Sequence, residues 1–342
     1  MHCELLIPTL LAPNEAIGDL RLPALELLLA RARRTNSDEE ESAGSWLARA
    51  FLRDEGPLPA GALTVLADGG EGHVEPAEAL WLRADPIHLG IEGGHATLVP
   101  SAALGISRDE AASLCETLNA HFAGEMTIHP LHAECWSARL DAPIAPPVAR
   151  SPLELARLPI KEHLPTGEAA QRWHGLLNES QMLLHNHPVN AARETRGAPA
   201  INSLWFWGAG RLPEHAATHW QSVTADDPVA AGLARLAGVV RRTLPHDAAK
   251  WLAGAPAAGV HLLMLDALQA PQALGDLQAA AERLRELEDR WFAPLYAALR
   301  AGRLGMITLR LPDAGGASYE VTRADLRRFW RRARPLATYL RD

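Results

Sequence analysis

The regular alternation of strands and helices in the second half of the chain constrains its fold more than any other feature. Strands separated by helices form right-handed crossovers, which give a mainly parallel sheet covered on both faces. A further apolar strand is expected at Leu5–Leu11. The sequence therefore predicts an α/β fold with a mainly parallel sheet flanked by helices. The expected strands are 201–207, 260–265 and 303–311, and the expected helices are 168–185, 228–242, 273–300 and 322–334.

The pattern changes between the first strand and this alternating half. From Val74, short apolar stretches alternate with glycine-containing turns, as in small β-strands. Ser107–Glu110 has the form of a capping box ahead of a helix, and prolines gather in 141–152, which is typical of a linker. We expect a small inserted α+β domain over 73–152. The larger α/β domain would then consist of 1–72 and 153–342.

The charge and cysteine content disfavour several classes of protein. The 342 residues include 41 Asp and Glu against 33 Lys and Arg, a formal net charge of −8 that makes nucleic acid an unlikely partner. Three cysteines without a CxxC pair argue against a disulfide framework or a cysteine-rich zinc site. No apolar run approaches the roughly 20 residues of a membrane span. Without a secretory signal at the start, a soluble, cytoplasmic protein is expected.

The segment from Asn178 to Pro213 concentrates residues that could carry chemistry. His185 and His187 would share one face of a strand, as metal ligands require. A proline follows His187, however, and the residue before proline avoids the helical conformation. We therefore expect the two imidazoles to cap or bond a helix end. Arg193 could bind an anion or pair with its charged neighbours, and we expect the pairing.

This segment resembles the archaeal-type, cofactor-independent phosphoglycerate mutases of the alkaline phosphatase superfamily. The resemblance runs in order across nearly the whole chain and is strongest at 161–213. With the pattern LRADPIHL at Leu82–Leu89, it narrows to a bacterial group described as regulatory proteins of the RpfE type. The elements that carry it are His163–Gly167, the HPVN motif at His187–Asn190, Arg193, Gly197, Pro199 and the Trp-rich strand Trp205–Gly210.

The resemblance implies an alkaline phosphatase-like fold, an inserted substrate domain, two divalent ions such as Mn or Zn, and a serine nucleophile. Such a site needs carboxylates and imidazoles at fixed strand ends. Most of the family's motifs are altered here: no Asp-Gly follows the first strand, and no histidine occurs after His261. Gln269 and Ala273 stand where an aspartate and a histidine belong. Ser45 is a possible remnant of the nucleophile, and Asp313 keeps one ligand position.

We therefore predict that the metal site is lost, that no cofactor is used and that no residue is a metal ligand. The leading interpretation is a catalytically degenerate mutase-like protein with a regulatory role. It would bind a small phosphorylated or acidic ligand in an interdomain cleft, or a protein partner. The candidate ligand-binding residues are Arg83, His187, Arg193 and Asp313.

Two alternatives remain open at this stage. The first is an active, metal-dependent phosphoglycerate mutase or phosphatase with relocated ligands. The second is a DNA- or protein-associated regulator that uses an Arg-rich C-terminal helix at 322–334, although a solvated helix face explains the same residues. The histidines available for relocated ligands are His129, His132, His163, His185 and His187.

Overall fold

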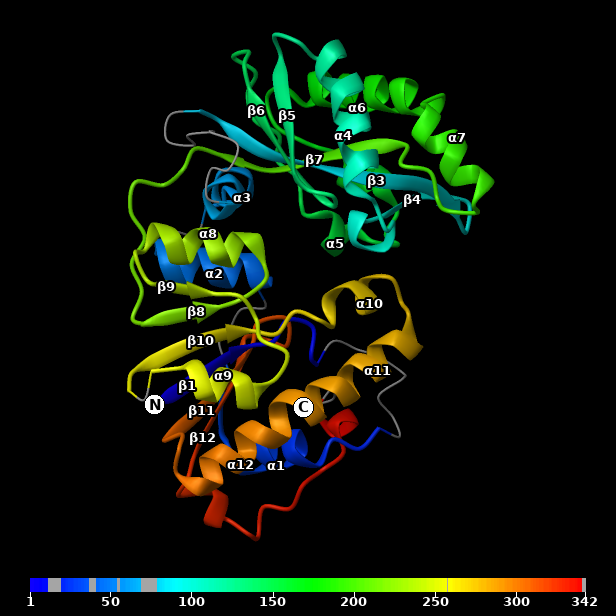
Figure 1. Ribbon diagram of the computed structural model, residues 1–342. Helices are drawn as coiled ribbons and strands as arrows, with labels where there is room; N and C mark the ends of the chain where they lie inside the picture. The colour runs from blue at the N-terminus through cyan, green and yellow to red at the C-terminus, as the bar shows by residue number, and fades with distance from the viewer. Residues whose placement is uncertain (12–19, 37–40, 54–55, 69–78, 257, 340–342) are drawn as a thin grey trace. The chain divides into compact units, whose positions relative to one another are not determined.

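The computed structural model describes residues 1–11, 20–36, 41–53, 56–68, 79–256 and 258–339 (Figure 1). The chain divides into two compact units, and each is described by itself. The first unit contains 1–55 and 215–342, and the second contains 56–214. The second unit is thus an insertion in the sequence of the first.

The sheet of the first unit has seven strands in the order β2-β12-β11-β1-β10-β8-β9. The five strands from β11 to β9 run parallel, and only β12 and β2 at one edge are antiparallel. The predicted α/β fold with a mainly parallel sheet is confirmed. The strands are β1 (His2–Leu6), β2 (Arg33–Thr35), β8 (Ser222–Thr224), β9 (Val240–Arg242), β10 (Val260–Met264), β11 (Met306–Leu311) and β12 (Ala317–Thr322).

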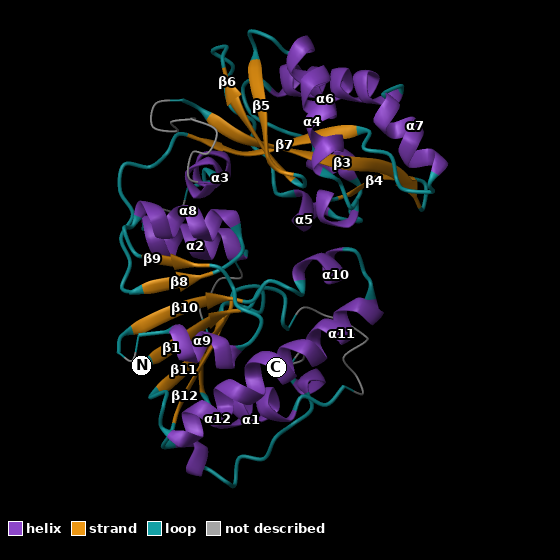
Figure 2. Cartoon of the chain, in the orientation of Figure 1, coloured by secondary structure: helices purple, strands orange, loops and turns teal. Residues whose placement is uncertain are grey.

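Helices cover both faces of this sheet (Figure 2). Side chains alternate between faces along a strand, so Leu5, Leu263 and Leu309, which are paired in register, point to the same side. They form one core with α1, α9, α11 and α12. On the opposite face, α8 packs against β8 and β9. The helices are α1 (Pro23–Arg31), α2 (Ala43–Leu52), α8 (Pro228–Leu236), α9 (Ala248–Gly254), α10 (Gln269–Ala273), α11 (Leu277–Leu287) and α12 (Ala293–Ala301), with a π-helical turn at Glu288–Phe292.

The second unit is an α+β structure built on an antiparallel sheet. Its strands run in the order β4-β3-β6-β5, and β7 pairs with β3. Its core is rich in tryptophan, including Trp136, Trp173 and Trp205. The strands are β3 (Trp81–Glu92), β4 (His95–Val99), β5 (Met126–His132), β6 (Cys135–Leu140) and β7 (Ser203–Gly210). The helices are α3 (Ala60–Asp68), α4 (Arg108–His121), α5 (Pro152–Leu155), α6 (Ala170–His185) and α7 (Pro188–Thr195).

The compact units differ from the predicted boundaries of 73 and 152. The inserted unit extends to residue 214 because β7 pairs antiparallel with β3 along most of its length. It begins at residue 56 because α3 packs against β3 and β7. The alternating half of the sequence is therefore shared between two units: the strand expected at 201–207 belongs to the antiparallel sheet, not the parallel one.

The predicted helix at 322–334 is wrong. In this segment the structure has only a short 3-10 turn at Asp325–Arg327. The Asp325 carboxylate accepts hydrogen bonds from the Thr322 amide and hydroxyl, at 2.9 and 2.6 Å, which ends β12 in a tight turn. The arginines here lie on irregular chain. Among the described residues, no helix combines the length and the apolar character needed to cross a membrane.

The close packing of α3 on β3 generates a stability prediction. A Cβ at Gly61 would lie 2.4 Å from the Leu82 Cα, so Gly61→Ala forces backbone to move and lowers the free energy of unfolding by roughly 2–3 kcal/mol. Gly175→Ala in α6 is the control, because its Cβ would meet only side-chain atoms at 3.4 Å or more. That variant gains helix propensity and is expected to be as stable as wild type or more so. Thermal unfolding compares the two. Equal destabilisation would contradict the packing.

Candidate functional site

Arg83 lies in β3 and is nearly enclosed, with its guanidinium bound inside the second unit. Its Nε and Nη2 donate to Asp85 Oδ1 at 3.1 and 2.5 Å, and its guanidinium lies 5.4 Å from the centre of the Trp207 ring. Asp85 in turn accepts a 2.7 Å hydrogen bond from Trp207 Nε1. A buried pair with this many partners is electrostatically satisfied. Arg83 therefore holds β3 to β7.

Arg193, at the end of α7, is fully buried. Its Nε donates to the Pro199 carbonyl at 2.7 Å, Nη1 donates to Glu110 at 3.0 Å, and Nη2 donates to the Leu104 carbonyl. The expected pairing within its own segment is replaced by pairing with Glu110 of α4, which also binds Arg196. Arg193 thus links α4, α7 and the chain before β7.

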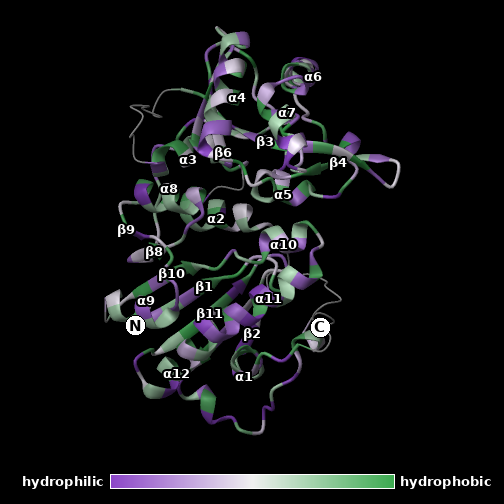
Figure 3. Ribbon diagram, turned by 45° about the vertical axis from the view of Figure 1, so that its right-hand side comes forward, coloured by the Kyte–Doolittle hydropathy of each residue, from purple (hydrophilic) through white to green (hydrophobic). Residues whose placement is uncertain are grey.

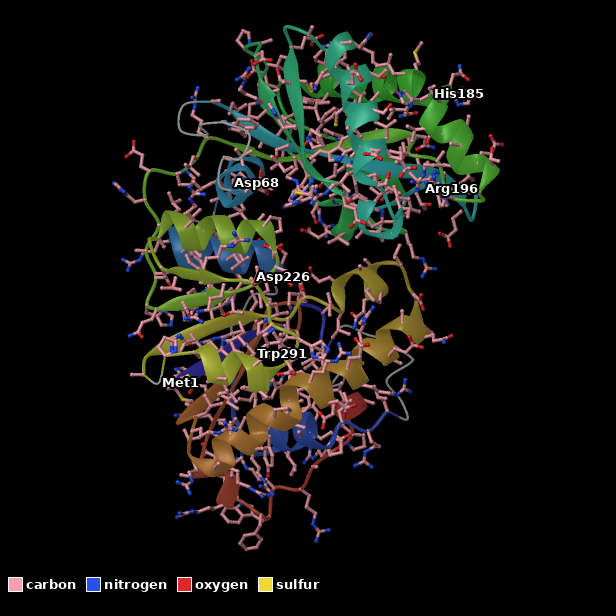
Figure 4. The ribbon with its side chains drawn as sticks, viewed as in Figure 1. Met1, Asp68, His185, Arg196, Asp226 and Trp291 are labelled. Atoms are coloured by element: carbon pink, nitrogen blue, oxygen red, sulfur yellow. The ribbon has the colours of Figure 1, made fainter. Side chains whose placement is uncertain are left out.

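His187 is the N-cap of α7, as the proline after it indicated. Its Nδ1 accepts from the Val189 amide at 3.2 Å, so the 3.0 Å contact of Nε2 with Thr117 Oγ1 has the imidazole as donor. Burial lowers the pKa of His187, which keeps the ring neutral. His185 ends α6 and is exposed (Figure 4), so the two rings do not share a strand face.

Asp313 lies in the first unit, in the turn after β11. Its Oδ2 accepts a 2.8 Å hydrogen bond from the Thr9 amide, in the chain that follows β1. Thr9 has φ of 61°, a left-handed conformation that is unfavourable for a β-branched residue. The Asp313 carboxylate thus holds a strained turn at the carboxyl edge of the sheet. Neither Asp313 nor Thr9 belongs to the unit that contains Arg83, His187 and Arg193.

Ser45 lies in the first turn of α2, with its hydroxyl 3.1 Å from that of the N-cap residue Ser42. Ser42 Oγ also accepts the Ser45 amide at 3.2 Å. A serine nucleophile is activated by a neighbouring base or by a metal ion. The second serine hydroxyl is neither, and these contacts of Ser45 stabilise the start of the helix.

Aspartates that the sequence analysis missed follow two further parallel strands. Asp226 and Asp227 come after β8, and Asp266 comes after β10 (Asp226 is labelled in Figure 4). Burial and the negative charges of Asp227 and Asp226 raise the pKa of Asp266 to about 7. Acidic residues are therefore present at strand ends where none was expected. Only Asp266 had a signal in the sequence, because it directly follows the predicted apolar strand at 260–265. Strand β8 is Ser-Val-Thr, which has no apolar run, so nothing indicated that Asp226 and Asp227 follow a strand.

Two of these aspartates have one oxygen bonded to a backbone amide. Asp226 Oδ1 accepts the Leu244 amide at 2.9 Å, and Asp227 Oδ1 caps α8 by accepting the Ala230 amide at 2.7 Å. In the part of the chain that the structure describes, no three His, Cys, Asp or Glu side chains meet in an arrangement that could hold a metal ion. No histidine follows β1, β8, β10 or β11 directly.

A small cavity of about 200 Å³ lies beside the carboxyl end of β11. Two arginines line it: Arg49 from α2, which pairs with Glu41, and Arg310 from β11. Arg310 donates to the buried carboxylate of Glu4 at 3.3 Å and to Ser318 Oγ at 3.0 Å. Two guanidinium groups that line a polar cavity are suited to binding an anion. The other lining residues are Thr35, Asn36, Glu41, Trp46, Leu311, Pro312, Gly316, Ala317 and Ser318.

The raised pKa of Asp266 predicts how stability depends on pH. The folded state binds this proton more tightly than the unfolded chain does, so the stabilisation is complete below pH 4 and declines as pH rises through about 7. Asp266→Asn cannot lose a proton. Relative to wild type, it should gain roughly 2 kcal/mol between pH 5 and 8. Unfolding measured across this range tests the effect, and a constant difference between the two proteins would contradict it.

The two partners of Glu110 provide a matched test of structural roles. Arg193→Ala removes a fully buried guanidinium and should lower the free energy of unfolding by about 3 kcal/mol or more. Arg196 binds the same carboxylate but its side chain is 51% exposed, so Arg196→Ala should cost about 0.5 kcal/mol. Denaturant titration measures both. Similar values for the two variants would show that Arg193 is not a structural centre.

Sequence comparisons place similarity in parts of this chain. No family model matches it. A probable 2,3-bisphosphoglycerate-independent phosphoglycerate mutase of Geobacter sulfurreducens is 43% identical over 68 residues, 20% of this chain and 17% of that protein. The 2,3-bisphosphoglycerate-independent phosphoglycerate mutase of Methanosarcina barkeri is 30% identical over 125 residues, 35% of this chain and 31% of that protein. The matches thus span between 17% and 31% of these relatives.

Among solved structures, the cofactor-independent phosphoglycerate mutase from Thermoplasma acidophilum aligns with a TM-score of 0.39 at 16% identity. The alignment covers 94% of this chain and 89% of that one. The narrower resemblance to the RpfE-type group stays a prediction. Over the matched segments, the chain is homologous to 2,3-bisphosphoglycerate-independent phosphoglycerate mutases.

Proposed function

We propose that this protein is a catalytically degenerate homologue of the cofactor-independent phosphoglycerate mutases, with a regulatory role exerted by binding a small phosphorylated or acidic molecule. One observation carries the proposal: aspartates at the carboxyl edge of the parallel sheet each have one oxygen bonded to a backbone amide of their own unit. Asp226, Asp227 and Asp313 each accept such a bond, at 2.7 to 2.9 Å.

Two-metal phosphoryl transfer needs carboxylates that are ionised and directed at the ions. Ser45, the remnant nucleophile, has another serine as its neighbour. The backbone bonds of the aspartates and the surroundings of Ser45 together support binding without turnover.

We place the anion site at the cavity lined by Arg49 and Arg310 rather than at Arg83 or Arg193. Both cavity arginines contact carboxylates that a ligand anion could partly replace. The guanidinium groups of Arg83 and Arg193 already bind several protein atoms and are buried. Trp46 adds an apolar wall, and Ser318 and Asn36 add hydrogen-bonding groups. This combination favours a small molecule with a phosphate or carboxylate group.

The first test separates a degenerate protein from an active enzyme. Calorimetric titration with Mn²⁺ or Zn²⁺ should show no tight binding of two equivalents, and a mutase assay with phosphoglycerate should show no interconversion. Two tightly bound equivalents, with turnover that Asp313→Asn abolishes, would overturn the proposal. That outcome would favour the active, metal-dependent alternative, for which the strand-end aspartates are the supporting observation.

The second test concerns the anion site and is independent of metal. Titration of the wild-type protein with phosphoglycerate should release heat. Arg49→Ala should weaken the affinity roughly tenfold, because one charge-assisted contact is lost. Arg285→Ala, an exposed arginine on α11, is the control and should bind like wild type. Equal affinity of the Arg49 variant and the control would place the ligand elsewhere.

A further inference from the structure

The first unit has a groove of about 1100 Å³ at the edge of the sheet, away from the carboxyl-edge aspartates. It lies between α1, the edge strand β2 and the irregular chain that follows β12, drawn in red in Figure 1. We call it the basic groove. Its lining includes Arg33, Arg34, Arg328, Arg331, Arg332 and Arg334, with Tyr319, Trp330 and Tyr339, and the acids Glu320 and Asp325.

The wall of the groove is held in place by specific contacts. Arg331 Nη1 donates to the Ala32 carbonyl at 2.8 Å, and Arg31 Nη1 donates to the Leu326 carbonyl at 2.8 Å. Farther along, Leu336 is fully buried in the core of the first unit. These anchors tie the C-terminal segment to the end of α1. The groove is therefore a built feature of the fold and not the surface of a loose tail.

The groove has a strong excess of positive charge in a chain whose net charge is −8. Six arginines line it against two acids, and Asp325 already pairs with Arg328 at 2.8 Å. Within the described residues, Arg33, Arg332 and Arg334 are in no ion pair. Arginine presents a planar set of donors that matches phosphate oxygens. The charge therefore favours a polyanion.

The aromatic rings beside the arginines indicate which kind of polyanion the groove binds. Trp330 lines the groove and is 65% exposed, and its neighbour Phe329 is 78% exposed. The two ring centroids are 5.3 Å apart in an edge-to-face arrangement, and both side chains are largely exposed to solvent. Unpaired bases stack on such rings, whereas the bases of a duplex are already stacked on one another.

We propose that the basic groove binds single-stranded nucleic acid, with arginines on the phosphates and Trp330 stacked on a base. The site is separate from the proposed anion cavity, so either proposal can fail alone. The net negative charge of the rest of the surface limits binding to this groove. The corrected structure of 322–334 makes this possible, since the arginines and aromatic residues line one groove together with β2.

The test uses fluorescence anisotropy of the full chain with a labelled oligodeoxythymidine of about 15 nucleotides. Binding should be tighter than to duplex DNA and should weaken steeply with salt. Arg332→Glu with Arg334→Glu should weaken binding more than tenfold. The matched control reverses two exposed arginines elsewhere in the first unit, Arg285→Glu with Arg290→Glu, and should bind nearly like wild type.

A second variant separates stacking from charge. Trp330→Ala keeps every arginine and should weaken binding roughly tenfold with the salt dependence unchanged. Absence of binding at low salt would overturn the proposal. So would equal loss in the control. Binding of polyglutamate as tight as that of the oligonucleotide, insensitive to Trp330→Ala, would instead identify the groove as a site for acidic polypeptides. Circular dichroism confirms that each variant is folded.

Discussion

The parallel pairing of β1 with β10 on one side and β11 on the other is the interaction on which the first unit depends. Leu5 lies opposite both Leu263 and Leu309, and all three are fully buried. This register aligns the ends of the strands as well as their middles, so the turns after β1, β10 and β11 gather at one edge. Figure 3 shows the hydrophobic strands at the centre of this unit. The position of Asp266 and Asp313 at one edge of the sheet is a direct result of that alignment.

The sequence predicted what depends on local pattern and missed what depends on distant partners. Alternating strands and helices indicated the parallel sheet, and the capping box at Ser107 is present at the start of α4. The pairing of β7 with β3 joins residues more than a hundred positions apart, and no local signal reveals it. The helical periodicity at 322–334 was overridden by tertiary anchors such as that between Arg331 and Ala32.

The candidate functional residues of the two units, each taken by itself, show the same division. The proline after His187 correctly indicated a helix cap. The partners of Arg193 could not be read from its neighbours, because Glu110 and Leu104 lie more than eighty positions away. Asp226, Asp227 and Asp266 can be read in the sequence, but only the pairing of the strands shows that they lie at the same edge of the sheet. The distribution of charge could not be predicted either. The net charge of −8 gives no sign of the basic groove, because its arginines come from two separate parts of the chain.

The interior position of Arg193 has a consequence for how variants of this protein would be read in a cell. A motif residue that is a candidate for ligand binding invites the interpretation that its loss abolishes binding. Here the guanidinium supports α4, α7 and the chain before β7, so its loss raises the unfolded fraction. Unfolded protein is removed by proteases, and a change of 1–2 kcal/mol alters abundance several-fold. The phenotype of an Arg193 variant would therefore report the amount of folded protein in the cell, and would carry no information about its ligand.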